Sequence, residues 1–230
     1  MYIVHGWTYT TEKWEPFLTD FKKLGFEIVF LNVPGLTAPI DRPYTLDDYV
    51  EWLHKQLANE TEPVAILAHS NGGRISIAYT LKYPNKVKNL VLIGSAGVKQ
   101  RDFLVLLKIA VFGFLARIGR PLKRVPFLRN LFYKIVREKD YKEANETMQK
   151  TMSNLITVDL APRLHEIAQP VLLIWGKRDG MTPFSGAKVM EKNFPKAELH
   201  SIEDAFHSPF ATHSQAVIDI IQTYYEKNNF

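Results

Sequence analysis

The sequence predicts an α/β fold in which a mainly parallel sheet of about six strands is covered by helices. Short runs rich in Val, Ile and Leu recur along the 230 residues, and longer amphipathic stretches separate them. Strands that are apolar along their whole length are typical of parallel sheets buried on both faces. With 46% hydrophobic and 12% aromatic residues, the chain can bury a full core, which excludes disordered and fibrous classes.

The strands and one helix start can be placed from local signals. We expect strands at residues 1–5, 26–32, 63–68, 87–94, 170–175 and 196–202. The stretch TLDDYVEWLHKQL has helical spacing, and Thr45 stands before it as a candidate N-cap with acidic residues in the first turn.

The alternation stops after Gly97 and resumes near Val158, which indicates an insertion. We expect a core of residues 1–98 and 158–230, with residues 99–157 as a helical cap inserted after the strand that ends near Gly94. The cap contains FLVLLKIAVFGFLARI, which is too short for a membrane span and carries Lys108 inside it. A buried cap helix is the simpler interpretation, and a segment lying in a membrane interface is the alternative.

The positive charge is concentrated in this insertion. Residues 99–139 carry a net charge of +9, the rest of the chain carries −4, and the whole chain carries +5. A basic block of this kind can contact anionic lipid or attract an acidic substrate. No nucleic-acid-binding motif accompanies it, so the sequence predicts no nucleic-acid partner.

The stretch ILAHSNGGR, residues 66–74, is the most informative motif. A buried strand ends there in small residues, and a helix begins at once, so the chain must turn sharply at Ser70. The pattern Ala-His-Ser-Asn-Gly is one substitution, Ala68, away from the G-x-S-x-G nucleophile elbow. The sequence therefore predicts Ser70 as a nucleophile above the positive end of a helix.

A serine nucleophile needs a histidine base and an acid that orients it. The segment VLLIWGKRDGMTP places Asp179 after a strand, and AELHSIEDAFHSPF places His207 after the next one. The chain order Ser, Asp, His is the order that this kind of triad follows on a parallel sheet. Asp159 and Asp204 are rival acids, but the first precedes a helical turn and the second adjoins the histidine.

At these motifs the chain resembles the α/β-hydrolase family over nearly its whole length. HGW at residues 5–7 is similar to the oxyanion loop, NVPGLTAP to the Pro-Gly loop, and AFHSPF to the histidine loop of that family. The resemblance implies that the backbone N–H groups of Trp7 and Asn71 hold the oxyanion. The sequence begins at what is normally the family's third strand, so we expect either a six-stranded core without the first antiparallel hairpin or a chain trimmed at its N-terminus.

Several residues are candidates for contact with substrate, namely Gly6, His69, Phe103, Phe112 and Phe206. No metal-ligand spacing and no G-x-G-x-x-G motif after a strand is present, so we expect neither a metal nor a cofactor. The chain has no cysteine and shows no secretory signal at its start, which fits a cytoplasmic protein of unknown oligomeric state.

The resemblance implies a serine hydrolase that cleaves carboxylic esters through an acyl-enzyme, and the apolar composition of the cap indicates substrates with apolar acyl or aryl groups. A carbon–carbon bond hydrolase of ring-cleavage diketones would use the same triad and a similar cap, and so would a thioesterase or a monoacylglycerol lipase. A ligand-binding protein on a hydrolase fold is the alternative outside enzymes. Sequence alone does not separate these alternatives.

Overall fold

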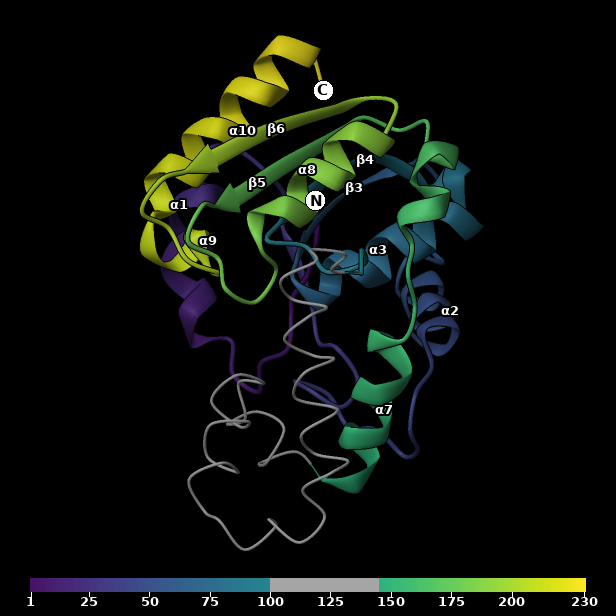
Figure 1. Ribbon diagram of the computed structural model, residues 1–230. Helices are drawn as coiled ribbons and strands as arrows, with labels where there is room; N and C mark the ends of the chain where they lie inside the picture. Colours follow the sequence, from purple (N-terminus) through teal and green to yellow (C-terminus); the bar gives the residue numbers. More distant parts are fainter. Residues whose placement is uncertain (100–144) are drawn as a thin grey trace, which may run out of the picture.

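The computed structural model describes residues 1–99 and 145–230, and these residues form a parallel sheet with helices on both faces (Figure 1). The strands, in chain order, are β1 (Tyr2–Val4), β2 (Val29–Leu31), β3 (Val64–His69), β4 (Val87–Ile93), β5 (Val171–Gly176) and β6 (Ala197–Ile202). Their order across the sheet is β2-β1-β3-β4-β5-β6, and every neighbouring pair is parallel. The predicted fold class is confirmed.

The helices follow the strands as the alternation predicts. They are α1 (Glu15–Lys22), α2 (Leu46–Gln56), α3 (Asn71–Lys82), α7 (Glu146–Ile156), α8 (Phe184–Asn193), α9 (Pro209–Thr212) and α10 (Ser214–Asn228), with short 3₁₀ helices η1 (Glu12–Trp14), η2 (Pro84–Lys86) and η4 (Ala161–Glu166). The central strands lie at their expected positions. Strand β2 is shorter than the predicted residues 26–32, because it is an edge strand that pairs only with the three residues of β1.

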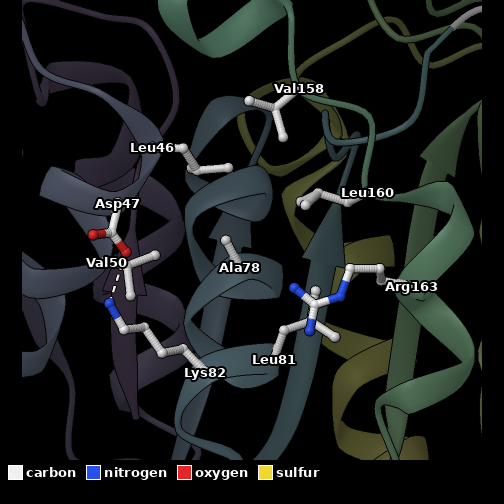
Figure 2. Close-up of a pocket in the computed structure, with 9 residues that line it drawn as sticks. All are labelled: Leu46, Asp47, Val50, Ala78, Leu81, Lys82, Val158, Leu160 and Arg163. Carbon is white, nitrogen blue, oxygen red and sulfur yellow. Dashed lines mark hydrogen bonds and ion pairs between the residues drawn. The ribbon is translucent and has the colours of Figure 1, made fainter.

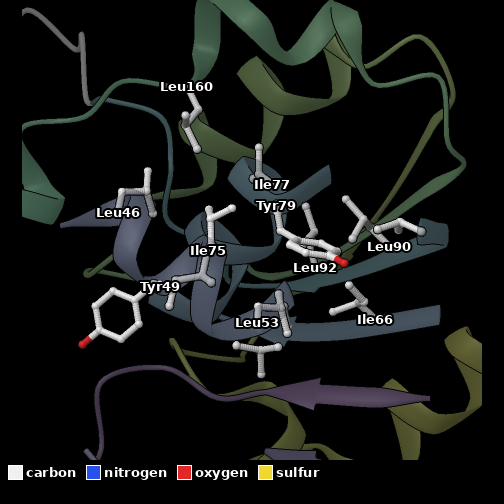
Figure 3. Packing of buried hydrophobic residues seen from close by; sticks show 14 of the residues in the cluster. Leu46, Tyr49, Leu53, Ile66, Ile75, Ile77, Tyr79, Leu90, Leu92 and Leu160 are labelled. Atoms are coloured by element: carbon white, nitrogen blue, oxygen red, sulfur yellow. The ribbon is translucent and has the colours of Figure 1, made fainter. Parts of the chain in front are cut away.

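The two faces of the sheet bury two separate hydrophobic clusters. Alternate strand residues such as Ile66, Leu90 and Leu92 point to one face, where they pack against α2 and α3 (Figure 3). The residues between them, such as Leu67 and Val91, pack against α1 and α10 on the other face. Burial on both faces explains why these strands are apolar without alternation.

The start and return of the long insertion lie next to each other. The backbone N–H of Leu160 donates to the carbonyl of Gly97 at 2.8 Å, and the N–H of Lys99 donates to Asp159 at 3.2 Å. Helix α7, which belongs to the predicted cap, places Met148 and Leu155 in the cluster under α2 and α3. The division into core and cap stays a prediction, and the segment 103–118 lies outside the described residues.

In residues 1–99 and 145–230, no helix is long and apolar enough to cross a membrane.

The start of α2 generates a stability prediction. Thr45 accepts a hydrogen bond from the Asp48 N–H, and the Asp48 carboxylate accepts one from the Thr45 N–H, so the two form a capping box. We expect Thr45→Ala to lower the free energy of unfolding by about 1 kcal/mol, because the Asp48 N–H loses the hydroxyl oxygen that accepts its hydrogen bond. Chemical denaturation measures this change. Thr45→Ser keeps the oxygen, and an equal loss in that variant would contradict the role of the cap.

Candidate active site

The strand order positions the site. The strand order reverses at β1, because the next strand, β2, lies on one side of it and β3 lies on the other. Ligands bind at such a switch point, outside the carboxyl ends of the strands. The HGW loop follows β1 and Ser70 follows β3, so both lie at this point, and the loops after β5 and β6 supply Asp179 and His207 at the same edge.

Ser70 stands at a strained turn between β3 and α3. Its backbone φ is 52° and ψ is −119°, although it is not glycine. Such a conformation costs about 1–3 kcal/mol and persists only where the surroundings fix it. A Cβ placed on Gly72 would lie 2.0 Å from the carbonyl oxygen of Val4, so only glycine lets α3 begin this close to β1. The turn therefore holds the serine hydroxyl at the edge of the sheet.

Ser70, His207 and Asp179 form a continuous hydrogen-bonded chain. The Ser70 Oγ lies 2.9 Å from His207 Nε2, and His207 Nδ1 lies 2.8 Å from Asp179 Oδ2. All three are buried, with 8%, 9% and 5% of their surfaces exposed. The structure thus brings together the three residues that the sequence singled out, with the distances that proton transfer from a serine to a histidine requires.

The carboxylate of Asp179 is held ionised by its neighbours. Burial opposes ionisation, but the hydrogen bond and charge of His207, together with bonds from Thr182 and the Met181 N–H, lower the pKa of Asp179 below its usual value. The Met181 and Thr182 N–H groups donate to Oδ1 at 2.7 and 3.0 Å. An ionised acid beside Nδ1 fixes the histidine tautomer that leaves Nε2 free to accept a proton.

Thr182 is a residue of this site to which the sequence analysis gave no role. Its hydroxyl lies 2.8 Å from Asp179 Oδ2, 2.9 Å from the Gly94 carbonyl and 3.2 Å from His207 Nδ1. It therefore ties the acid to the end of β4. The quoted motif GKRDGMTP contained this threonine, but only a fold shows that its hydroxyl reaches Asp179.

The predicted oxyanion loop lies directly against Ser70. A Cβ on Gly6 would be 2.7 Å from Ser70 Cβ, so glycine is needed where the two segments touch. Among the described residues, the backbone N–H groups of Trp7 and Asn71 have no hydrogen-bond acceptor. His5 is buried and bonded to Thr37 Oγ1 at 2.7 Å, which braces the loop. Free N–H groups in this place suit an oxyanion.

The predicted substrate contacts divide into three groups. Phe206 is 49% exposed beside the histidine, and the Arg178 guanidinium stacks on its ring at 4.8 Å. His69 lies deeper, where its Nε2 bonds the His207 carbonyl at 2.9 Å and its ring packs against Phe210. Phe103 and Phe112 lie outside the described residues.

The rival acids lie elsewhere. Asp204 is highly exposed, with 86% of its side chain accessible, and its carboxylate lies 4.0 Å from Arg178. Asp159 accepts the N–H groups of Lys99 and Ala161 and so holds the base of the insertion. Within the described ranges, no cluster of three His, Asp or Glu side chains could hold a metal ion.

A separate cavity of about 460 Å³ opens between α2, α3 and η4 (Figure 2). No triad residue lines it; its walls are formed by Leu46, Asp47, Val50, Ala78, Leu81, Lys82, Val158, Leu160 and Arg163. Its cations are already paired, Lys82 with Asp47 at 2.7 Å and Arg163 with Glu166 at 2.7 Å. This cavity therefore offers an apolar floor without an unpaired charge.

The parallel sheet and the arrangement of Ser70, His207 and Asp179 fit one class of protein, the α/β hydrolases, and comparison with known proteins agrees. The chain belongs to the α/β-hydrolase family, whose model, described as alpha/beta hydrolase fold, matches residues 1–214. The chain is similar in structure to an alpha/beta hydrolase enzyme from the metagenome of sediments of the lagoon of Mar Chica, Morocco. That likeness has a TM-score of 0.73 at 20% identity and covers 100% of this chain and 91% of the other. The family resemblance predicted from the sequence is confirmed.

Two curated relatives are more informative about chemistry. The chain is 25% identical over 228 residues to the pimeloyl-(acyl-carrier protein) methyl ester esterase of Nitrosomonas europaea, which covers 90% of this chain and 88% of the relative. It is 23% identical over 257 residues to the 2-hydroxy-6-oxononadienedioate/2-hydroxy-6-oxononatrienedioate hydrolase of Escherichia coli, covering 95% of this chain and 84% of the relative. Both relatives are named as hydrolysing enzymes.

The burial of His69 generates a prediction about pH. Burial, followed by the charge of His207, lowers the pKa of His69 from 6.5 to about 3. Below pH 6.5 the unfolded chain therefore binds a proton that the folded protein does not, so stability falls as the pH falls toward 3. Between pH 7.5 and pH 5, we expect wild type to lose about 2 kcal/mol more unfolding free energy than His69→Gln.

Denaturant unfolding at several pH values measures this difference. His165→Gln, at an exposed position, is the control for loss of a histidine. If His69→Gln and wild type lose the same free energy on acidification, the assignment of a buried neutral His69 is wrong.

Proposed function

We propose that this protein is a serine hydrolase of carboxylic esters that works through an acyl-enzyme. The observation that carries the proposal is the buried chain from Ser70 Oγ through His207 to Asp179, with contacts of 2.9 and 2.8 Å. The family membership and the esterase among the relatives support the reaction class. The name of that relative specifies a methyl ester, so a methyl ester is the simplest substrate to test.

In the proposed mechanism His207 acts first as a base. Its Nε2 takes the proton of Ser70 Oγ while that oxygen attacks the ester carbonyl carbon, and Asp179 stabilises the imidazolium that forms. The carbonyl oxygen becomes an anion held by the N–H groups of Trp7 and Asn71. Collapse of the intermediate releases the alcohol, which takes the proton from His207, and leaves the acyl group on Ser70.

The second half of the reaction uses the same groups. Water enters, His207 takes one of its protons, and the resulting hydroxide oxygen attacks the acyl carbon. The carboxylic acid leaves when His207 returns the proton to Ser70 Oγ. Apart from the ester and one water molecule, the proposed cycle uses only Ser70, His207, Asp179 and the two backbone N–H groups.

A carbon–carbon bond hydrolase is the second candidate, because the Escherichia coli relative is named as a hydrolase of a dienedioate and a trienedioate. Esters remain the first choice because several curated relatives are named as methyl ester esterases. The two candidates share Ser70, His207 and Asp179. A test on both substrate classes therefore separates them.

Removal of the nucleophile is the first test. We expect wild type to hydrolyse p-nitrophenyl esters from acetate to decanoate, and Ser70→Ala to lose roughly 10³-fold or more of kcat/KM. Wild type should also react with a fluorophosphonate at Ser70, because only an activated serine reacts quickly. Equal, feeble turnover by both proteins would reject the ester proposal. Cleavage of a ring-cleavage diketone by wild type would then favour the second candidate.

Substitution of each carboxylate tests whether Asp179, rather than the rival Asp204, is the acid that orients His207. We expect Asp179→Asn to lower kcat by about 10³- to 10⁴-fold, because the amide favours the wrong histidine tautomer. Asp204→Asn is the matched control, since that carboxylate is exposed. Steady-state kinetics on one ester measure both variants. A larger loss in Asp204→Asn than in Asp179→Asn would exchange the two roles.

A further inference from the structure

Arg74 is a buried cation one helical turn after the nucleophile. Only 9% of its surface is exposed, yet no carboxylate of the described residues forms an ion pair with it. Its one hydrogen bond within these residues runs from Nη1 to Asn71 Oδ1 at 3.2 Å, and its buried Nε has no acceptor. Charged groups are rarely buried without a partner, because desolvation penalises the charge.

The guanidinium lies at the same end of α3 as the Ser70 hydroxyl. Side chains on a helix lean toward its N-terminus, and positions four apart share one face. The bond to Asn71, the first residue of α3, shows that Arg74 follows this rule. Asn71, which directly follows Ser70, is also the residue whose backbone N–H is proposed to hold the oxyanion, so Arg74 contacts the side chain of a residue next to the proposed nucleophile.

The start of α3 has no acidic side chain of its own, and the Asp179 carboxylate nearby is engaged by His207 and Thr182. The first turn of α3 contains no acidic residue, although the N-terminus of a helix carries a partial positive charge. A cation at that position is unfavourable unless an anion joins it. A second buried donor without an acceptor, Nε1 of Trp7, belongs to the loop on the other side of Ser70. Both segments that flank the nucleophile therefore present unused N–H groups.

Arg163 differs from Arg74 because its guanidinium is paired with a carboxylate. Arg163 is exposed, and its guanidinium binds the Glu166 carboxylate through two hydrogen bonds of 2.9 and 2.7 Å. Arg74 has the same forked set of donors, which suits a carboxylate in two-point contact. Its place is buried, however, and that carboxylate is absent from the described residues.

We propose that Arg74 binds a carboxylate carried by the substrate, so that the preferred substrates are acidic esters such as half-esters of dicarboxylic acids. This inference rests on the proposed ester hydrolysis at Ser70 and names its substrate class. The carboxylate supplies the counter-charge for the guanidinium and fixes the ester carbonyl near Ser70. Arg74 is thus a specificity-determining residue that acts on one class of ester.

Monomethyl and dimethyl adipate provide a matched pair of substrates, because they differ in one free carboxylate. We expect wild type to prefer monomethyl adipate in kcat/KM. Arg74→Met should lower kcat/KM for monomethyl adipate by roughly 30-fold or more, because a buried charge pair is lost, and should leave dimethyl adipate little changed. Arg74→Lys should keep part of the preference, and Arg163→Met is the control for loss of a positive charge.

A binding measurement separates this inference from the proposed function. Adipate should slow the labelling of Ser70 by a neutral fluorophosphonate in wild type, and should not slow it in Arg74→Met. Thermal unfolding shows whether Arg74→Met is folded, and Arg74→Gln replaces it if it is not. Protection by adipate without turnover of either ester would overturn ester hydrolysis and retain the carboxylate site.

Two results would overturn the role of Arg74. One is Ser70-dependent turnover of both esters without preference, with no protection by adipate. The other is an equal loss on both esters in Arg74→Met, which would mean that Arg74 supports the oxyanion loop through Asn71 rather than the substrate. Failure of Ser70 to turn over esters or to react with the fluorophosphonate would overturn both proposals together.

Discussion

The close approach of three backbone segments around Ser70 is the constraint on which the rest of the structure depends. Ser70 occupies a left-handed conformation that side chains disfavour, and Gly6 and Gly72 allow β1 and its loop to touch it. This arrangement is stable only because β1 and β3 are adjacent and parallel, with Val4 paired to Ala68. The conformation of Ser70 therefore depends on both the order of the strands and the positions of the two glycines.

The loops that carry the other site residues are held in place by hydrogen bonds to their backbone groups. The N–H of Arg178 bonds the carbonyl of Ala205, which joins the acid loop to the histidine loop. Trp175 Nε1 bonds the Thr182 carbonyl at 2.6 Å, and His69 bonds the His207 carbonyl. Groups held in this way keep their geometry before a substrate arrives, which is the condition for electrostatic preorganisation.

Much of this architecture could be predicted from the sequence, because it depends on local signals. A local structure is predicted by each of three signals: the apolar strands, the Thr45 cap and the small residues around Ser70. Ser70, Asp179 and His207 could be found because each of them follows the end of a predicted strand. Arg74 and Thr182 were missed because their importance depends on what lies near them in space. A cation in the first turn of a helix was nevertheless a signal, since that position favours acids.

The position of helix α7 illustrates another limit of sequence reasoning. Its amphipathic pattern predicts a helix but does not say which surface receives its apolar side. Met148 and Leu155 pack into the main core cluster, and the Thr151 hydroxyl accepts the Tyr44 N–H at 3.0 Å. A residue range assigned to a cap by its place in the sequence thus contributes directly to the core.

The hydrogen bond between Gly97 and Leu160 has a consequence for how this chain can change over time. Because this bond and the one from the Lys99 N–H to Asp159 join the two ends of the segment, the segment begins and ends at neighbouring places on the core. The entropy of closing such a segment grows slowly, by about 0.6 kcal/mol for each doubling of its length. Insertions and deletions before α7 leave the strand register and the core contacts of α7 untouched, so one scaffold can acquire new substrate ranges by exchange of a single contiguous piece of sequence.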